Sequence, residues 1–367
     1  MKILFLTNHL NIGGVTSYCL TLGEALKERG NRVYIASSGG ELLFKFIEAG
    51  IDFVPIPIRT KKELSPKVIF SAVKLLRTVR DNKIDIVHSN SRTTQVLGCL
   101  LKRYAGVTHV HTCHGFFKRR LHRRLFPCWG KKVIAISEQV KEHLIRDFRV
   151  KADDIRVIHN GIDADRFRPN NAFDKRQAKI NLGLGSGPVI GIIGRLSDVK
   201  GHIFLVEAMG QVLRSVPSAQ LVIVGEGRMK EGLISRAREL GIEDSVYFLP
   251  AVSDTRPMLQ LMDIFCMPSL EEGLGLSLME AMASGLAVVG SDIGGIKTLI
   301  RDGLNGLLVP PQDAESLGLA IVSLLEDERR RLMLAAEARE FIVKSFSCAK
   351  MAEETQKVYL ECLGAKA

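Results

Sequence analysis

The chain has 367 residues, which exceeds the usual length of a single hydrophobic core and is typical of two domains. Its composition, 46% hydrophobic and 25% charged, excludes a disordered chain and is typical of a soluble globular protein, and no apolar run approaches the roughly 20 residues that span a bilayer. The net charge of +11 is concentrated in residues 1–170, with 30 Lys and Arg against 15 Asp and Glu, whereas residues 171–367 carry 21 against 25; this asymmetry predicts a partner with negative charge, either nucleic acid or an anionic membrane surface.

The opening segment, "MKILFLTNHL", predicts a first β-strand rather than a signal peptide, because it continues into "NIGGVTS" instead of a cleavage site. Further β-branched runs follow at residues 32–37, 52–57, 85–89, 109–114, 132–137 and 155–160. Amphipathic segments such as residues 17–30 and 66–81 separate them. Apolar strands that alternate with helices predict a parallel sheet covered on both faces.

"IGGVTS", residues 12–17, directly follows the first strand and opens a helix. Gly13 and Gly14 permit close backbone approach, and a helix N-terminus offers free N–H groups to an anion. A dinucleotide site is only weakly indicated, because the motif is not G-x-G-x-x-G and no acidic residue ends the second strand. An anion-binding turn and a plain strand-to-helix turn both remain open.

Two histidines stand at strand ends, His88 in "IVHSNS" and His114 in "THVHTCHGF". Considered alone, a histidine in such a place is more often structural than functional. If His88 is functional, we expect it to line the side of the first domain that meets a substrate.

A basic stretch, "FFKRRLHRRLFPCWGKK", covers residues 116–132. Its cations alternate with aromatic and aliphatic residues, a pattern that suits an anionic membrane surface. The alternative is a solvated basic face that covers a core, and no nucleic-acid-binding motif accompanies the charge. The candidates for contact with such a membrane surface, or with a substrate that it holds, are Lys118, Arg119, Arg120, Arg123 and Arg124.

A polar segment rich in Gly, Asn and Pro, residues 163–188, separates the two halves of the chain. We predict a first domain over residues 1–165, a linker over 166–188, a second domain over 189–347, and a helix over 348–367 that packs back on the first domain. The "DAD" at residues 163–165 imitates a metal-binding Asp-x-Asp motif, but its place beside the linker argues against metal binding there.

The second half repeats the alternation, with strands predicted at residues 188–194, 219–227, 245–250, 263–269 and 286–292. "GRLSDVKG", residues 194–201, follows the first of these strands. Arg195 and Lys200 are cations on a glycine-bounded loop, which suits the clamping of a diphosphate whose charge grows as a bond breaks. Two solvated basic residues are the alternative.

"EEGLGLSLMEAMASG", residues 271–285, predicts a helix over 275–284 whose glycine-flanked N-terminus points its amides at an anion. Glu272 precedes this helix and Glu280 lies within it. Each carboxylate can accept hydrogen bonds from two vicinal hydroxyls, so each suits a sugar or ribose diol. A capping Glu and a solvated Glu are the alternative.

With "VGEG" and "DGLNGLLVPPQD" in the second half, and "HTCHG", "VIAISEQVKEHL" and "IHNGIDADRFRP" in the first, these motifs cover nearly the entire chain. In this combination the sequence resembles the retaining, nucleotide-sugar-dependent glycosyltransferases of family 4, the glycosyl transferases group 1. The resemblance implies the GT-B architecture, in which two Rossmann-like, doubly wound α/β domains face a cleft.

The resemblance also assigns roles to residues. Arg195 and Lys200 take charge off the departing nucleotide, Glu272 lies beside the donor sugar, and His114 hydrogen-bonds the transferred sugar; these four form the catalytic set. Glu280 holds the ribose hydroxyls, and we expect His88, if it is functional, to line the acceptor side of the first domain. The remaining donor-binding residues are Gly13, Gly14, Glu226, Ala251, Val252, Gly273, Leu274, Gly275, Leu276 and Ser277, with Leu274 standing where Phe is frequent in the family.

We therefore expect a retaining glycosyltransferase that moves a sugar from a nucleotide-diphosphate sugar to a lipid-linked or cell-envelope glycan. Cations can replace a metal at the diphosphate, so no metal or cofactor is expected. Seven scattered cysteines without a C-x-x-C pair indicate free thiols in a reducing cytoplasm, and the basic stretch indicates the inner membrane face. The alternatives are a soluble disaccharide or glucan synthase, a catalytically silent binding subunit, and a sugar-nucleotide epimerase.

Overall fold

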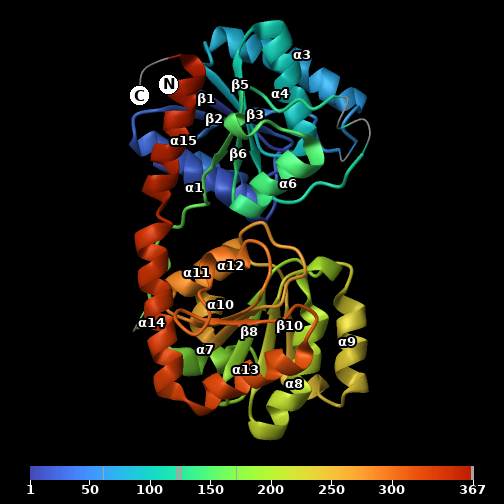
Figure 1. Cartoon of the computed structure of the whole chain (residues 1–367), viewed down its shortest axis with the longest axis vertical. Helices are drawn as coiled ribbons and strands as arrows, with labels where there is room; N and C mark the ends of the chain where they lie inside the picture. The colour runs from blue at the N-terminus through green and yellow to red at the C-terminus, as the bar shows by residue number, and fades with distance from the viewer. Residues whose placement is uncertain (61, 121–122, 124–125, 171, 365–367) are drawn as a thin grey trace. The chain divides into compact units, whose positions relative to one another are not determined.

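The computed structural model describes residues 1–364 apart from residues 61, 121–122, 124–125 and 171 (Figure 1). It divides the chain into two compact units, Met1–Gly161 with Cys348–Ala367, and Ile162–Ser347. Each unit contains a parallel sheet with helices on both faces. The predicted fold class, two Rossmann-like doubly wound α/β domains, is confirmed.

Among the described residues, the first unit has a seven-stranded parallel sheet in the order β3-β2-β1-β4-β5-β6-β7. Its strands are β1 (Lys2–Leu6), β2 (Arg32–Ser37), β3 (Asp52–Pro55), β4 (Ile86–Ser89), β5 (Thr108–Cys113), β6 (Lys132–Ala135) and β7 (Ile155–Val157). Its helices are α1 (Gly14–Glu28), α2 (Leu43–Glu48), α3 (Pro66–Asp81), α4 (Arg92–Ala105), α6 (Glu138–Phe148) and α15 (Cys348–Leu363).

Strand β1 shows why this sheet needs helices on both faces. Ile3 and Phe5 pack into one buried cluster with α1 and α15, whereas Leu4 and Leu6 pack into another with α3 and α4. Alternate side chains of a strand point to opposite faces, so a strand that is apolar at every position must be covered twice. The strand order reverses at β1 and β4, which makes the loops after these strands the expected place for ligand contacts.

The second unit has a parallel sheet in the order β10-β9-β8-β11-β12-β13, six strands within the described residues. The strands are β8 (Val189–Ile193), β9 (Gln220–Val224), β10 (Val246–Leu249), β11 (Ile264–Met267), β12 (Ala287–Ser291) and β13 (Leu307–Val309). The helices are α7 (Lys175–Asn181), α8 (His202–Ser215), α9 (Lys230–Glu239), α10 (Arg256–Leu261), α11 (Leu276–Ala283), α12 (Ile296–Leu299), α13 (Ala314–Glu326) and α14 (Glu328–Ser345). Here the order reverses at β8 and β11.

The sequence did not reveal the edge strand β13, whose three residues Leu307–Val309 are too short to show an alternating pattern. The segment predicted as a linker, residues 166–188, belongs to the second unit and contains α7. Asp174 caps that helix, since its Oδ1 accepts from the backbone N–H of Gln177 at 2.8 Å. The surrounding Gly and Asn residues are typical of a loop, so the sequence did not indicate this helix. Asp163 of the "DAD" segment similarly caps a turn, accepting from the backbone amides of Asp165 and Arg166 at 3.1 and 3.0 Å.

The last helix, α15, packs in the first unit against α1. Met351, Val358 and Tyr359 are buried there in one cluster with Ile3 and Phe5. In the part of the chain that the structure describes, no helix combines the length and apolar character needed to cross a bilayer.

Candidate functional site

In the second unit, the loops that follow β8, β9, β11 and β12 are joined by backbone hydrogen bonds. Leu270 N donates to Val199 O at 2.8 Å, Leu196 N to Glu226 O at 2.9 Å, and Gly295 N to Glu272 O at 3.0 Å. The carboxyl ends of neighbouring parallel strands therefore carry one continuous loop surface at the point where the strand order reverses.

Glycines permit this close backbone packing. A Cβ on Gly201, whose φ is +67°, would lie 1.8 Å from the carbonyl oxygen of Pro268. A Cβ on Gly295 would lie 2.3 Å from the carbonyl oxygen of Gly273. Each glycine is thus required by contact with a neighbouring loop.

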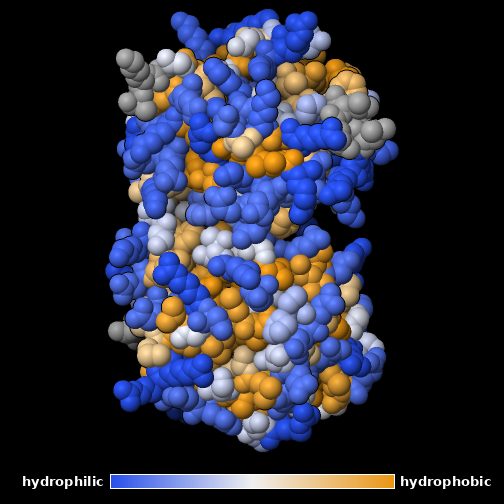
Figure 2. All heavy atoms as spheres, viewed as in Figure 1, coloured by the Kyte–Doolittle hydropathy of each residue, from blue (hydrophilic) through white to orange (hydrophobic). Residues whose placement is uncertain are grey.

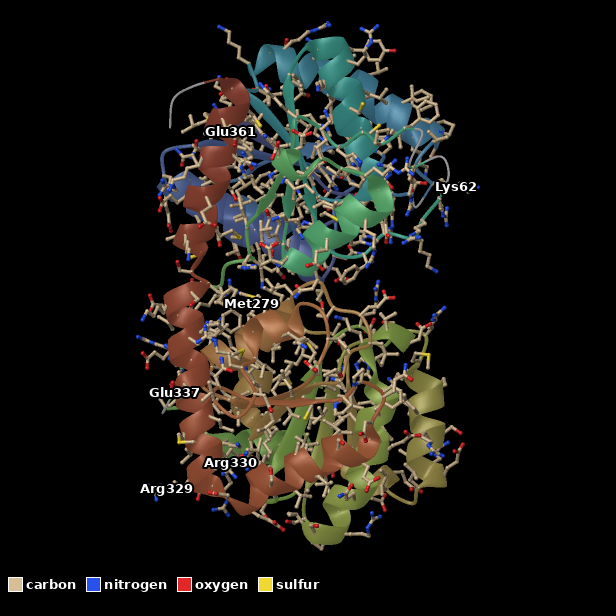
Figure 3. All side chains as sticks on the ribbon, in the orientation of Figure 1. Lys62, Met279, Arg329, Arg330, Glu337 and Glu361 are labelled. Carbon is tan, nitrogen blue, oxygen red and sulfur yellow. The ribbon has the colours of Figure 1, made fainter. Side chains whose placement is uncertain are left out.

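Helix α11 opens toward this surface without a side-chain cap. Its N-cap, Gly275, has a left-handed backbone with φ 98°. The amides of Leu276 and Ser277 belong to the first turn, whose N–H groups have no acceptor within the helix. Gly273, Leu274 and Gly275 are buried before the helix, and Met279 of the same helix, labelled in Figure 3, is 0% exposed. An uncapped helix N-terminus can bind an anion, which is the role that the sequence predicts for this one.

Lys200 and Glu272 form an ion pair on this surface, Nζ to Oε2. Their side chains are 24% and 13% exposed, so the pair is shielded from bulk water yet still accessible. Lys200 ends a short 3₁₀ turn, Asp198–Lys200, that places it opposite the 269–275 loop. The predicted diphosphate cation and the predicted sugar carboxylate are therefore in direct contact.

Arg195 and Glu226 are exposed residues of the adjoining turns. The turn that contains Arg195 is joined to the "GEG" turn by the Leu196–Glu226 backbone bond, and by Arg228, which donates to Asp198 Oδ1 at 2.6 Å. Among the described residues, the Arg195 guanidinium has no ion-pair partner and is available to an anion.

Glu280 lies on α11 with its carboxyl group against the segment that follows β10. Thr255 Oγ1 donates to its Oε2 at 2.9 Å. Burial raises the pKa of Glu280 to about 7, with the nearby Asp254 carboxylate adding to the rise. Ala251 and Val252, the half-buried residues predicted to pack the base, begin this same segment. Sequence reasoning missed Thr255, because a single Thr in a loop carries no signal.

Beneath this loop surface, the buried residues Ser269 and His202 have polar side-chain atoms without a hydrogen-bond partner among the residues that the structure describes. Ser269 is fully buried, and its Oγ is unpartnered. His202, the first residue of α8, is 2% exposed, and both of its ring nitrogens are unpartnered. Burial lowers the pKa of His202 to about 4, so the ring is neutral near pH 7.

In the first unit, His114 follows β5 and is oriented by Asn90. The amide Nδ2 of Asn90 donates to His88 O at 3.3 Å, which turns its Oδ1 toward Nε2 of His114 at 3.2 Å. Nε2 must then carry the proton, leaving Nδ1 as an acceptor. Burial lowers the pKa of His114 to about 3, so this residue acts as a neutral imidazole. Its ring also contacts Tyr18 edge-on, with centroids 4.5 Å apart.

His88 does not line a surface, which corrects the prediction that it faces the acceptor. The residue is 0% exposed. Its Nδ1 contacts the Tyr359 hydroxyl and its Nε2 the Thr112 hydroxyl, both at 2.6 Å. His88 is a core residue that joins the sheet to α15.

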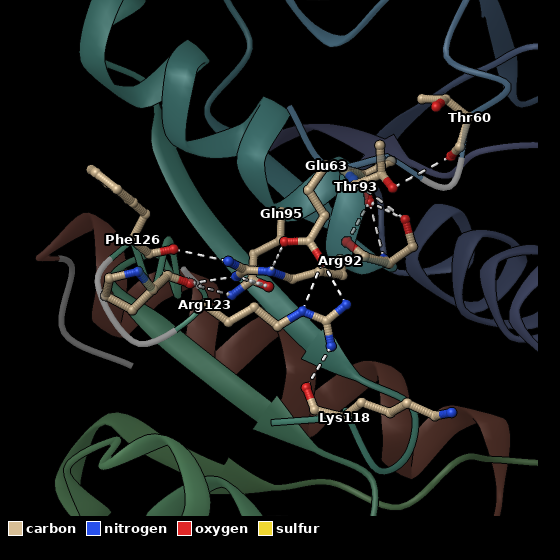
Figure 4. Close-up of polar contacts among 11 residues, drawn as sticks. Thr60, Glu63, Arg92, Thr93, Gln95, Lys118, Arg123 and Phe126 are labelled. Atoms are coloured by element: carbon tan, nitrogen blue, oxygen red, sulfur yellow. Dashed lines mark hydrogen bonds and ion pairs between the residues drawn. The ribbon is translucent and has the colours of Figure 1, made fainter. Parts of the chain in front are cut away.

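Two cations of the basic stretch likewise form contacts within the first unit. Arg123 donates from Nε to Glu63 Oε1 at 2.7 Å, and its side chain is only 13% exposed, so it cannot meet a membrane (Figure 4). Arg119 is ion-paired with Asp147. Lys118 and Arg120 are exposed, and Arg124 lies outside the described residues.

Sequence analysis did not anticipate Arg92, the centre of this network. It is 8% exposed and donates to Glu63 Oε2 at 3.0 Å, Gln95 Oε1 at 2.8 Å and Phe126 O at 2.8 Å (Figure 4). Burial opposes ionisation of Glu63, but hydrogen bonds from Arg123 and Arg92 lower its pKa below the usual value. The network fastens the basic stretch to α4.

At the N-terminus of α1, Gly13 and Gly14 are exposed. A Cβ at either position would meet nothing within 4 Å. No side chain caps the helix, so its first amides are open to a ligand.

Two family models match the chain and together span most of it. The model for Glycosyl transferases group 1 matches residues 174–341, which contain the whole loop surface described above. The model for Glycosyltransferase Family 4 matches residues 12–166. The chain belongs to the family 4 (group 1) glycosyltransferases. It is accordingly a glycosyltransferase, as the sequence predicted.

The alignments with two curated relatives cover most of this glycosyltransferase. It is 27% identical over 371 residues to an uncharacterised glycosyltransferase of Methanocaldococcus jannaschii, covering 95% of this chain and 94% of the relative. It is 29% identical over 307 residues to the UDP-Gal:α-D-GlcNAc-diphosphoundecaprenol α-1,3-galactosyltransferase of Escherichia coli, covering 79% of each. The solved structure of Anabaena Alr3699/HepE in complex with UDP-glucose matches with a TM-score of 0.87 at 22% identity, covering 98% of this chain and 100% of that one, which shows the shared GT-B fold.

Proposed function

We propose that this glycosyltransferase transfers a sugar from a nucleotide-diphosphate sugar to a lipid-linked or cell-envelope glycan, with retention of the anomeric configuration and without a metal ion. The observation that carries the proposal is the loop surface of the second unit. It gathers Lys200, Glu272, Arg195 and the open N-terminus of α11 at one edge of the sheet, with Glu280 on the same helix.

The diphosphate is proposed to bind at the α11 N-terminus and the two cations. The Leu276 and Ser277 amides supply hydrogen bonds to phosphate oxygens, and the helix dipole favours their charge. Arg195, which has no ion-pair partner within the described residues, and Lys200 supply positive charge for the leaving group. These cations do the work that a metal ion performs in other enzymes.

The two carboxylates are proposed to bind the two sugars of the donor. Glu280 accepts hydrogen bonds from the ribose hydroxyls, next to Ala251 and Val252, which pack the base. Glu272 accepts from the transferred sugar while it holds the Lys200 ammonium by charge. A bound donor thus shares Lys200 with Glu272 and keeps that carboxylate oriented.

In the proposed reaction, the bond between the anomeric carbon and the β-phosphate oxygen breaks, and its electron pair leaves with the nucleoside diphosphate. The acceptor hydroxyl forms its bond to the same face of the sugar, and its proton passes to the departing phosphate. Nδ1 of the neutral His114, left free by the Asn90 contact, accepts a hydrogen bond from a hydroxyl of the transferred sugar.

The proposed acceptor rests on charge and on one relative. The first half of the chain carries the positive charge, which suits an acceptor held by a phosphorylated lipid or by an anionic bilayer. The Escherichia coli relative is named for a diphosphoundecaprenol-linked sugar acceptor.

The test is to incubate the full chain with radiolabelled UDP-, GDP- and ADP-sugars and a polyprenyl-diphosphate-linked sugar, with and without EDTA. We expect one donor to give a lipid-extractable product, α-linked by NMR, at an unchanged rate in EDTA. An inverted linkage, EDTA-sensitive transfer, or transfer only to free sugars would each refute part of the proposal, and absence of donor binding would indicate a silent subunit.

A further inference from the structure

Helix α3 of the first unit is apolar on the side that faces away from the core. Val68, Ala72, Leu75 and Val79 form its buried stripe. At about 100° per residue, Ile69, Phe70 and Val73 fall outside this stripe, and they are 61%, 68% and 63% exposed. Because they are spaced three and four residues apart, they adjoin one another on the helix surface.

Cations surround this apolar face. Helix α3 carries exposed Lys67, Lys74, Arg77 and Arg80 and a single carboxylate, Asp81, a net charge of +3. Asp81 pairs with Arg77 at 3.2 Å, so most of the positive charge is not compensated on the helix. We refer to the set Lys67, Ile69, Phe70, Val73 and Lys74 as the α3 face.

Further cations and exposed side chains with apolar surface lie next to the α3 face. Arg80 donates to the carbonyl of Tyr104 at 3.2 Å, and Tyr104, on α4, is itself 62% exposed. Lys62, just before α3, extends away from the ribbon (Figure 3). Apolar side chains lie among hydrophilic ones over the part of the surface that α3 and α4 form (Figure 2).

A groove of about 540 Å³ opens beside the α3 face, lined by Ser38, Pro55, Ile56, Pro57, Phe70 and Lys74. Ser38 and Pro57 follow the ends of β2 and β3, so the groove lies at the carboxyl edge of the sheet. The segment that leads into α3 is held at this edge, because Asn8 Nδ2, after β1, donates to Thr60 O at 2.9 Å. The α3 face therefore lies at the carboxyl ends of the strands of this sheet, the same side of the sheet as His114.

We propose that the α3 face docks the first unit on the surface of an anionic lipid bilayer, with Ile69, Phe70 and Val73 entering the headgroup region. This inference names the membrane partner of the lipid-linked acceptor proposed above and rests on that proposal. Exposed apolar residues flanked by cations fit the boundary between acyl chains and anionic headgroups. Docking there brings the carboxyl edge of the first sheet to the membrane that holds the acceptor.

A second copy of the chain fits this surface less well. A two-fold interface places the same patch of both subunits in contact, so the cations of the α3 face would oppose one another. The exposed apolar residues of α2, Phe44 and Ile47, differ in their surroundings, since Glu41 and Glu48 flank them. They offer a control for apolar exposure without net positive charge.

The experiment is sedimentation of the full chain with vesicles of phosphatidylcholine containing roughly 30 mol% phosphatidylglycerol, in the absence of any donor. We expect salt-sensitive binding that pure phosphatidylcholine does not support. Lys67→Gln with Lys74→Gln should weaken binding about 25-fold, at about fivefold for each cation. Phe70→Ser should weaken it about tenfold, through loss of buried apolar area.

Two control variants lie outside the α3 face: Phe44→Ser on α2, and Lys118→Gln with Arg120→Gln in the basic stretch. Their affinity for vesicles should stay within about twofold of the wild type, well below the losses expected for the α3 variants. Unchanged binding in the α3 variants, or a loss confined to the Lys118 and Arg120 variant, would overturn the docking proposal. Self-association abolished by Phe70→Ser would do so as well. Nucleotide binding measured on the same variants separates the two proposals, because loss of vesicle binding with intact nucleotide binding leaves the donor site standing.

Discussion

The carboxyl ends of the strands differ in character between the two units. In the first unit, polar side chains there hydrogen-bond one another: the Thr112 hydroxyl lies 2.6 Å from His88 Nε2 and 3.2 Å from the Tyr18 hydroxyl. In the second unit, backbone contacts at glycines hold the loops, and the first amides of α11 have no side-chain cap. In the first unit most of these polar side chains hold the fold, with His114 and the uncapped N-terminus of α1 as exceptions, whereas in the second unit the uncapped α11 N-terminus lies beside the candidate ligand residues.

Buried histidines illustrate the first case. Ser89 Oγ bridges His109 Nε2 at 2.8 Å and His111 Nδ1 at 2.9 Å, and both rings are fully buried. Burial lowers the pKa of His109 to about 3, so this cluster remains neutral at physiological pH. The two histidines within β5, His109 and His111, are therefore part of the core, unlike His114, which follows the strand.

The largest effect is expected in the first unit, at Glu63. Glu63→Ala removes the carboxylate that pairs with buried Arg92 and Arg123, which should cost about 3–5 kcal/mol of unfolding free energy because a charge is left buried without its partner. Urea denaturation measures the loss. Nucleotide affinity of the folded variant should stay within about twofold of the wild type, well below the effect expected at a binding residue; a parallel collapse of nucleotide affinity would break the distinction between the two units.

Next in size is Lys200→Ala in the second unit. We expect donor turnover to fall about 10²–10³-fold, because a positive charge aimed at the leaving group is lost. The matched control is Lys175→Ala, which removes another partly buried lysine–carboxylate pair of the same unit, Nζ to Asp263 Oδ1 at 2.7 Å. Equal turnover losses in both variants would mean that Lys200 acts only through stability.

A glycine pair tests whether backbone contact builds the loop surface. Gly295→Ala places a Cβ 2.3 Å from the Gly273 carbonyl oxygen and 2.4 Å from Leu274 Cα. This clash should lower the free energy of unfolding by about 2 kcal/mol and weaken nucleotide binding. Gly232→Ala, in α9, adds a Cβ that meets nothing within 4 Å and should stabilise the protein by up to about 1 kcal/mol. Thermal unfolding and nucleotide titration of both variants check this; a Gly295→Ala variant with wild-type binding would contradict it.

The smallest effect concerns pH and Glu280. Burial raises its pKa from 4.5 to about 7, so the folded state retains a proton that the unfolded chain loses, and the stability present below pH 4.5 is lost as the pH rises through 7. Above pH 7, the free energy of unfolding of Glu280→Gln should therefore exceed that of the wild type by about 1–2 kcal/mol, whereas the variant should bind nucleotide about tenfold more weakly. A variant that loses both stability and binding would assign Glu280 a purely structural role.

The contrast between the units also explains what the sequence could predict. Positions where two backbones touch require glycine, and the cations and carboxylates beside them stand in short local motifs. The sequence could therefore name Arg195, Lys200, Glu272 and Glu280 as candidates, with their roles assigned through the family resemblance. The alternation of apolar runs predicted β8 and β11 and hence the edge where these residues meet.

Partners distant in the sequence could not be predicted in the same way. His88 contacts Tyr359, 271 positions away, and Glu63 joins Arg92 and Arg123 across three elements. Neither pairing leaves a local pattern. The pattern of the basic stretch thus predicts an exposed basic face although Arg123 is largely buried, and the pattern of residues 66–81 predicts only an amphipathic helix.

The most direct test of the donor site is calorimetric titration of a nucleoside diphosphate into the full chain and into its Arg195→Ala and Lys200→Ala variants. We predict that the wild type binds and that each substitution raises Kd at least about tenfold, since each removes a charge-assisted contact to the diphosphate. Equal Kd values for all three proteins would contradict the assignment of this loop surface to the diphosphate.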